Sequence, residues 1–158
     1  MKIPQIKPYV GLEEYESMKE CFETNWITEG PKSKQFVKEL CDMVGTKYGV
    51  LAPNGTLALY LGLRALGIQQ GDEVIVPNFT FIASATAVSM TGATPVFADV
   101  EMDSLQIDTQ ACEKVITPKT KAIMPVHIYG ASCNMTQVMD FADRHNLLVI
   151  EDAVFFFF

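Results

Sequence analysis

Short apolar segments alternate with longer segments of helical character from Lys47 onward, and this alternation constrains the fold more than any other feature. The apolar segments are continuous rather than alternately apolar and polar, which is typical of parallel strands covered by helices on both faces. The order therefore predicts βαβ units and an α/β domain with a mostly parallel sheet. We expect strand 48–52, helix 56–66, strand 73–76, helix 81–91, strand 95–98, helix 108–116, strand 122–126, helix 135–145 and strand 147–150.

The beginning and the end of the chain differ from this regular part. Prolines and glycines interrupt residues 1–35, with one helix expected near 13–24. A second helix is expected at 33–44, where apolar residues recur at helical spacing. We divide the chain into an N-terminal arm and helix at 1–35, the α/β segment at 36–154, and an atypical tail of phenylalanines at 155–158.

Charge and composition exclude several classes of partner. The 158 residues carry a formal net charge of −7, and no cluster of lysine or arginine offers a surface to nucleic acid. No segment approaches the roughly 20 apolar residues of a membrane span, and no signal peptide opens the chain. The scattered cysteines indicate reduced thiols in a cytoplasmic protein without a metal site. They are Cys21, Cys41, Cys112 and Cys133.

In a parallel sheet, ligands bind outside the carboxyl ends of the strands, so the residues that follow each strand are the candidates for a binding site. Asn54-Gly55-Thr56 follows the first expected strand and opens a helix. Gly55 would allow close approach of a ligand, and the free N–H groups of the first helical turn favour a phosphate. The alternative is that Asn54 or Thr56 only caps the helix, and the local sequence supports both interpretations equally.

Asp152 follows the last expected strand directly. A carboxylate in this place could pair with a cationic ligand group or with a metal. The alternative is a loop carboxylate that caps the next element, and for Asp152 alone this is the better interpretation. Its neighbour Glu151 should point to the other side of the strand and is interpreted as structural.

Aromatic residues and one histidine follow other strands of the expected sheet. Phe79 and Phe81 flank Thr80, and either ring could stack on a flat ligand, although core packing is the simpler interpretation for each alone. His127 could act as an acid or base, but a structural role is favoured. Together, the phosphate turn, an aromatic ring and the carboxylate of Asp152 indicate a planar, phosphorylated ligand with a ring nitrogen.

Several longer motifs resemble one protein family in their residues, order and spacing. The chain is similar to the DegT/DnrJ/EryC1/StrS sugar aminotransferases, which are fold-type-I enzymes dependent on pyridoxal 5′-phosphate. The resemblance covers nearly all of residues 1–154, and the Asn-Gly-Thr turn is similar to that of the perosamine-synthase branch. The motifs are WITEGPKSKQF, PNGTLALYLGLRALGIQQGDEVIVPNFTFIASATAV, GATPVFADVEMDSLQID, ITPKTKAIMPVHIYG and VIEDA.

The resemblance implies a role for each candidate residue. Gly55 and Thr56 would hold the cofactor phosphate, Phe81 would stack on the pyridine ring, and Asp152 would pair with the ring nitrogen. That carboxylate would keep the nitrogen protonated, so that the ring can serve as an electron sink. The implied reaction moves an amino group, usually from glutamate, to a keto sugar on a nucleotide, in a homodimer whose sites lie at the subunit interface.

The chain departs from the family pattern near its end. The Schiff-base lysine of the family lies well beyond the position of Asp152, whereas no lysine follows Lys121 here, and Phe155 stands where a polar residue is usual. We therefore expect the N-terminal portion of the large domain, truncated and inactive alone. The alternatives are a pyridoxamine-dependent sugar dehydratase of the same fold or a non-catalytic binding or assembly fragment.

Overall fold

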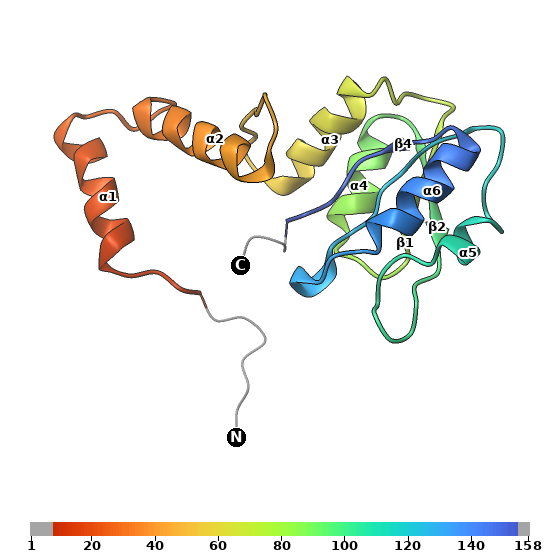
Figure 1. Ribbon diagram of the computed structural model, residues 1–158. Coiled ribbons are helices and arrows are strands. Elements are labelled where there is room, and N and C mark those ends of the chain that lie inside the picture. The colour runs from red at the N-terminus through yellow and green to blue at the C-terminus, as the bar shows by residue number, and fades with distance from the viewer. Residues whose placement is uncertain (1–7, 155–158) are drawn as a thin grey trace. The chain divides into compact units, whose positions relative to one another are not determined.

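The computed structural model describes residues 8–154, and the chain divides into two units, residues 1–51 and residues 52–158 (Figure 1). The contacts between residues thus separate into two groups after Leu51. The expected division between an arm and a domain at residue 36 stays a prediction. The phenylalanine tail at 155–158 lies outside the described residues.

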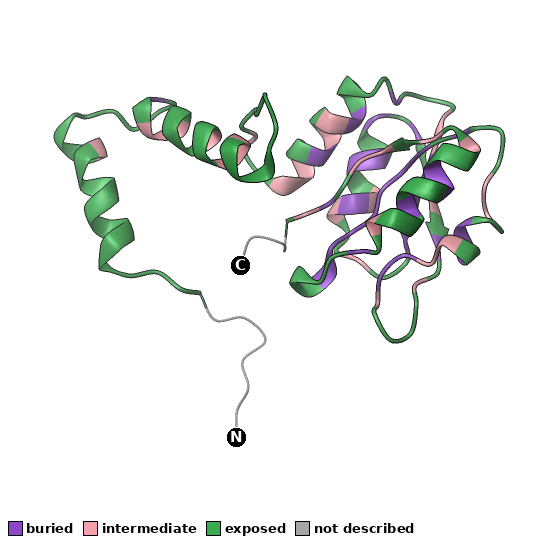
Figure 2. Cartoon of the chain, in the orientation of Figure 1, coloured by how far each residue is buried: buried purple, intermediate pink, exposed green. Residues whose placement is uncertain are grey.

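The first unit consists of helices α1, Leu12–Glu23, and α2, Pro31–Val44. The Glu14 carboxylate accepts the Gly11 N–H at 2.7 Å and so caps the start of α1. Helix α2 begins with Pro31 at its first position and ends at Gly45, whose φ of 70° is the left-handed conformation that glycine adopts easily. Neither helix contains a buried residue, and Figure 2 colours both almost entirely as exposed or intermediate.

The second unit is built on one sheet in which every strand pair is parallel. Its strands lie in the order β2-β1-β3-β4. They are β1, Glu73–Pro77; β2, Thr94–Ala98; β3, Thr120–Ile123; and β4, Leu148–Val149. The parallel sheet expected from the continuous apolar runs is confirmed.

Helices cover both faces of this sheet, as expected (Figure 1). Val74 and Val76 of β1 point to the face that packs against α3 and α4, whereas Ile75 between them points to the face that packs against α5 and α6. Both sides of the central strand are therefore buried in apolar side chains. The helices are α3, Gly55–Ala65; α4, Ala83–Met90; α5, Thr109–Cys112; and α6, Met135–His145.

Some expected elements are absent or shorter in the structure. Residues 48–52 do not form a strand: Val50 is 86% exposed, and the segment has no strand partner within the described part of the chain. An apolar sequence is not sufficient for a strand, because a strand also needs a neighbour to pair its backbone groups. The helix expected at 108–116 is regular only over α5, and Pro125, which has no N–H, follows the end of β3.

The strand order places a topological switch between β1 and β3. The chain leaves β1 towards β2 on one side of the sheet and later returns to β3 on the other side. The loops that follow β1 and β3 therefore diverge, which opens the crevice where α/β sheets bind ligands. An isolated parallel bridge between Val126 and Asp152 extends the pairing of β3 and β4 towards this same edge.

A surface cluster joins the end of α5 to the last turn of α6. Arg144 Nη1 lies 2.5 Å from Glu113 Oε1, and His145 Nε2 lies 2.9 Å from Glu113 Oε2. Arg144 and then His145 lower the pKa of the Glu113 carboxyl below its usual 4.5. The cluster thus stabilises the fold at pH values above the usual pKa of 4.5. This stabilisation is lost as the pH falls through the lowered pKa of Glu113.

We expect the Arg144→Ala substitution to raise the pKa of Glu113 back towards 4.5. The side-chain carboxyl carbon of Glu113, followed by NMR during an acid titration, measures this change. Lys119→Ala removes another surface cation of the same unit and should leave the titration unchanged. An identical Glu113 titration in the Arg144→Ala variant would show that the ion pair does not form in solution.

Candidate functional site

The N-terminus of α3 is capped by a side chain and still keeps backbone N–H donors that no carbonyl of the helix accepts. The side-chain oxygen of Asn54 accepts the Leu57 N–H at 3.0 Å, so the capping interpretation holds for this residue. The N–H groups of Gly55 and Thr56 occupy the first helical turn and have no acceptor within the helix. Two donors at the positive end of the helix dipole thus remain available to an anion.

Gly55 also lies close to a side chain of the protein itself. A Cβ atom at this position would lie 2.9 Å from Cγ2 of Val154, which is closer than van der Waals contact allows. The expectation that Gly55 serves the close approach of a ligand is therefore incomplete, because the glycine also makes room for Val154. The same contact places Val154 against the start of α3.

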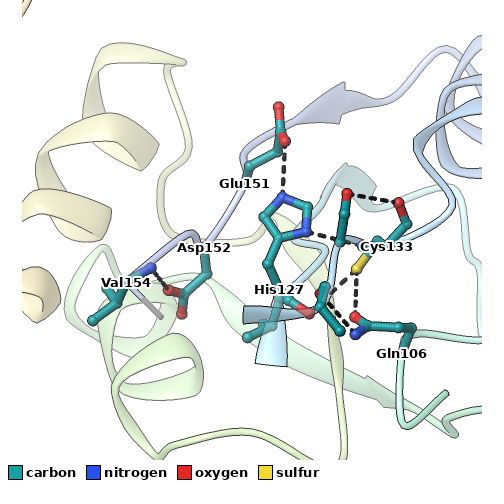
Figure 3. A network of polar contacts seen from close by, with 9 residues as sticks. Gln106, His127, Cys133, Glu151, Asp152 and Val154 are labelled. Atoms are coloured by element: carbon teal, nitrogen blue, oxygen red, sulfur yellow. Dashed lines mark hydrogen bonds and ion pairs between the residues drawn. The ribbon is translucent and has the colours of Figure 1, made fainter. Parts of the chain in front are cut away.

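Asp152 is 5% exposed and is held at the carboxyl-terminal edge of the sheet. Its N–H donates to the Pro125 carbonyl at 2.9 Å, and its own carbonyl accepts the His127 N–H at 3.0 Å. The Ser84 hydroxyl donates to Oδ2 at 2.7 Å. Within residues 8–154, Oδ1 accepts only the Val154 N–H, at 3.4 Å (Figure 3). The carboxylate is thus buried and oriented, with Oδ1 weakly used.

The aromatic rings after β1 are not part of the hydrophobic core. Phe81 is 63% exposed, and Phe79 is 40% exposed and lies 6.3 Å from the Tyr129 ring, centroid to centroid. The core-packing interpretation is therefore wrong for Phe81, whose ring is free to meet a ligand or another part of a protein. Thr80 between them is partly buried and hydrogen-bonds to Ser84 instead.

His127 is 3% exposed and is engaged through both ring nitrogens (Figure 3). Its Nδ1 accepts the Cys133 N–H at 3.0 Å and therefore carries no proton. Nε2 then carries the hydrogen and donates it to Glu151 Oε2 at 2.9 Å. This arrangement agrees with the structural role favoured for His127 and gives Glu151 a structural role too.

The same network extends through Cys133 to Gln106. The Cys133 thiol contacts Gln106 Oε1 at 2.9 Å and the Val126 carbonyl at 3.2 Å, and Gln106 donates to the Ala131 carbonyl. Burial raises the pKa of Cys133 to about 11, so the thiol stays protonated and is a poor nucleophile. The network thus fixes the turn after β3, in which Tyr129 has a φ of 55°.

The four cysteines are free thiols, as expected. Among residues 8–154, no group of three or more histidine, cysteine, aspartate or glutamate side chains is arranged to hold a metal ion. No helix in the described part of the chain is both long enough and apolar enough to cross a membrane.

Ser84 and Thr80 belong to the site but carry little signal in the sequence. Each is an ordinary small polar residue, and hydroxyls at the start of a helix usually cap it. The only hint is their spacing of four residues, immediately after a strand that ends at the ligand-binding edge. The contact of Ser84 with Asp152 spans 68 residues and depends on the fold.

Fold and site together define a class of protein: a parallel α/β domain with an open helix N-terminus, an exposed aromatic ring and a buried carboxylate near one edge of its sheet. The chain belongs to the DegT/DnrJ/EryC1/StrS aminotransferase family, whose sequence model matches residues 8–154. The family resemblance of the motifs is therefore confirmed.

Two curated relatives agree with this assignment. The chain is 44% identical over 151 residues to the spore coat polysaccharide biosynthesis protein SpsC of Bacillus subtilis, covering 96% of this chain and 39% of that protein. It is 46% identical over 153 residues to GDP-perosamine synthase of Caulobacter vibrioides, covering 96% of this chain and 41% of that protein. The chain thus spans about 40% of the length of these curated relatives.

The fold also matches a solved structure. NtdA of Bacillus subtilis with bound cofactor PMP (pyridoxamine phosphate) superimposes with a TM-score of 0.85 and 38% identity, over 90% of this chain and 33% of that one. The expected fold class, an α/β aminotransferase domain with a parallel sheet, is confirmed.

Proposed function

We propose that this chain supplies the cofactor-phosphate and ring-nitrogen contacts of a pyridoxal-phosphate-dependent sugar aminotransferase. The reaction moves an amino group from glutamate to a keto sugar linked to a nucleotide. The observation that carries the proposal is a buried, oriented Asp152 carboxylate at the sheet edge, in a chain that matches the family over residues 8–154. A relative named GDP-perosamine synthase and a neighbour with bound PMP support the substrate class and the cofactor.

The described residues fit the phosphate of such a cofactor. The N–H groups of Gly55 and Thr56 and the Thr56 hydroxyl would bind the phosphate oxygens at the positive end of α3. The contact does not need a basic side chain, which suits a chain with a net charge of −7.

The described residues also fit a cationic pyridine ring. Asp152 Oδ1 would accept the hydrogen of the ring nitrogen, and the exposed ring of Phe81 would cover one face of the pyridine. Because Asp152 is buried, water competes little with this charge-assisted hydrogen bond. Pyridoxal phosphate, when bound, supplies an electron sink for the chemistry at the amino group.

Further parts of the proposal rest on the family resemblance. We propose that the chain alone binds the cofactor without turnover, because its last lysine, Lys121, lies in the amino-terminal half of β3, away from the edge that holds Asp152. A homodimer and a cytoplasmic location belong to the same proposal. A sugar dehydratase would use the same contacts, and no observation favours it over the aminotransferase.

Calorimetric titration of the chain with PMP tests the proposal, because PMP has no aldehyde and does not require a lysine. We expect one PMP to bind per site. Asp152→Asn should weaken the affinity about tenfold or more, since it removes the charge from a buried hydrogen bond. Asp140→Asn, an exposed carboxylate on α6, is the matched control and should bind PMP like the parent chain.

Two results would count against the proposal. One is a chain that is folded by circular dichroism but does not bind PMP at all. The other is equal affinity in the parent and Asp152→Asn chains, which would place PMP elsewhere. Turnover of glutamate and a nucleotide-linked keto sugar by the chain alone would refute the part of the proposal in which this chain binds the cofactor without turnover.

A further inference from the structure

Two side-chain hydroxyl groups form a chain of hydrogen-bond contacts that ends at the Asp152 carboxylate. Thr80 Oγ1 lies 2.9 Å from Ser84 Oγ, and Ser84 Oγ lies 2.7 Å from Asp152 Oδ2. Thr80 belongs to the loop after β1, Ser84 to the first turn of α4, and Asp152 to the segment after β4. The chain of contacts therefore connects three segments that meet at the ligand-binding edge.

The proton positions in this chain follow from the donors available. An ionised carboxylate only accepts, so the single Ser84 hydrogen points to Asp152 Oδ2. The other Ser84 contact, to the Phe81 carbonyl, is longer at 3.4 Å. Thr80 must then donate its hydrogen to Ser84. Two hydroxyls donating in the same direction strengthen each other, and Ser84 is fully buried, so water does not interrupt them.

This chain of donors determines which carboxylate oxygen remains available. The N–H and carbonyl of Asp152 are both hydrogen-bonded, which fixes its backbone, and Ser84 holds Oδ2. Among the described residues, Oδ1 has only the long contact from Val154 (Figure 3). Rotation of the carboxyl group would break the short Ser84 bond, so Oδ1 keeps its direction.

The same contacts fix the loop that carries Phe81. Thr80 turns inward to Ser84, while Phe81, the next residue, is exposed. The inward Thr80 contact thus ties the loop with the exposed ring to the residue that holds the carboxylate.

We propose that Thr80 and Ser84 are positioning residues, which orient Asp152 Oδ1 towards the ring nitrogen of the bound cofactor. This proposal rests on the proposed function of the site. It assigns to the pair no contact with the ligand: both act through Asp152.

Isosteric substitutions at Thr80 test the proposal with a matched control. Thr80→Val removes the hydroxyl at nearly constant volume, and Thr80→Ser retains it. We expect Thr80→Val to weaken PMP binding about two- to fivefold and Ser84→Ala about tenfold, the range for loss of a buried hydrogen bond. Thr80→Ser, and Ser89→Ala at an exposed hydroxyl of α4, should bind PMP like the parent chain.

The absorbance of bound PMP as the pH is raised separates orientation from general packing, because it reports protonation of the ring nitrogen. With Asp152 disoriented, the ring nitrogen should lose its proton at a lower pH in Thr80→Val and Ser84→Ala than in the parent chain. Thr80→Val carries the test alone if Ser84→Ala does not fold.

The outcomes distinguish this proposal from the one on which it rests. Parental affinity and an unchanged ring titration in Thr80→Val, with weakened binding in Asp152→Asn, would overturn the positioning role alone. Lower affinity with an unchanged ring titration would reduce the pair to a packing role and also overturn it. A folded parent chain without PMP binding would overturn the proposed function itself.

Discussion

Replacement of Phe141 by alanine is expected to lower the free energy of unfolding by about 3–5 kcal/mol. Phe141 is fully buried on α6, in the cluster that covers the Ile75 and Ile123 face of the sheet. Its ring also lies 4.7 Å from the His145 ring, centroid to centroid. Truncation removes these contacts and leaves a cavity that rigid strands cannot fill.

Urea denaturation followed by circular dichroism measures this loss. Phe81→Ala removes the same atoms from an exposed ring and should change the free energy of unfolding by no more than about 0.5 kcal/mol. A similar loss in both variants would mean that Phe81 is buried in solution, and the exposed aromatic surface proposed for the cofactor would then be wrong.

Replacement of His127 by alanine is expected to lower the free energy of unfolding by about 2–4 kcal/mol, from a buried donor left without its acceptor and from a cavity. The ring accepts the N–H of Cys133, which is itself only 4% exposed. Without the imidazole, that N–H has no partner in the described network, and the turn that carries Tyr129 loses its support.

The matched variant is Glu151→Gln, which keeps an oxygen acceptor for His127 Nε2. Glu151 is half exposed, so we expect a loss below about 1 kcal/mol. Thermal or urea unfolding of the two variants in parallel measures the contrast. If His127→Ala were as mild as Glu151→Gln, the structural interpretation of His127 would fail and a chemical role would have to be reconsidered.

Much of the fold could be predicted because each local signal agreed with its neighbours. Helix α6 has the predicted bounds: Asn134 caps its start, and Asn146 ends it in the left-handed conformation. The continuous apolar runs correctly predicted a parallel sheet buried on both faces. Residues 48–52 carried the same apolar signal without a partner strand, and there the local pattern failed.

The candidate site was predictable only in part. Asp152 follows β4, so topology alone brings it to the carboxyl edge of the sheet. The turn at Asn54-Gly55-Thr56, in contrast, follows a segment that forms no strand. The exposure of Phe81, the closeness of Gly55 to Val154 and the bond from Ser84 to Asp152 depend on side chains brought together from distant segments. Local periodicity contains no information on such contacts, and the orientation of the His127 ring likewise depends on Cys133 and Glu151.

At Asp152, the sheet is paired through the backbone N–H and carbonyl, which every residue type except proline possesses. Its N–H and carbonyl complete the pairing with the segment after β3, whereas the carboxylate faces Ser84 and the ligand-binding edge. Mutational drift could therefore erase the carboxylate while the fold survives. In this architecture, a descendant without the Asp152 carboxylate could persist as a folded domain and be recruited for another purpose.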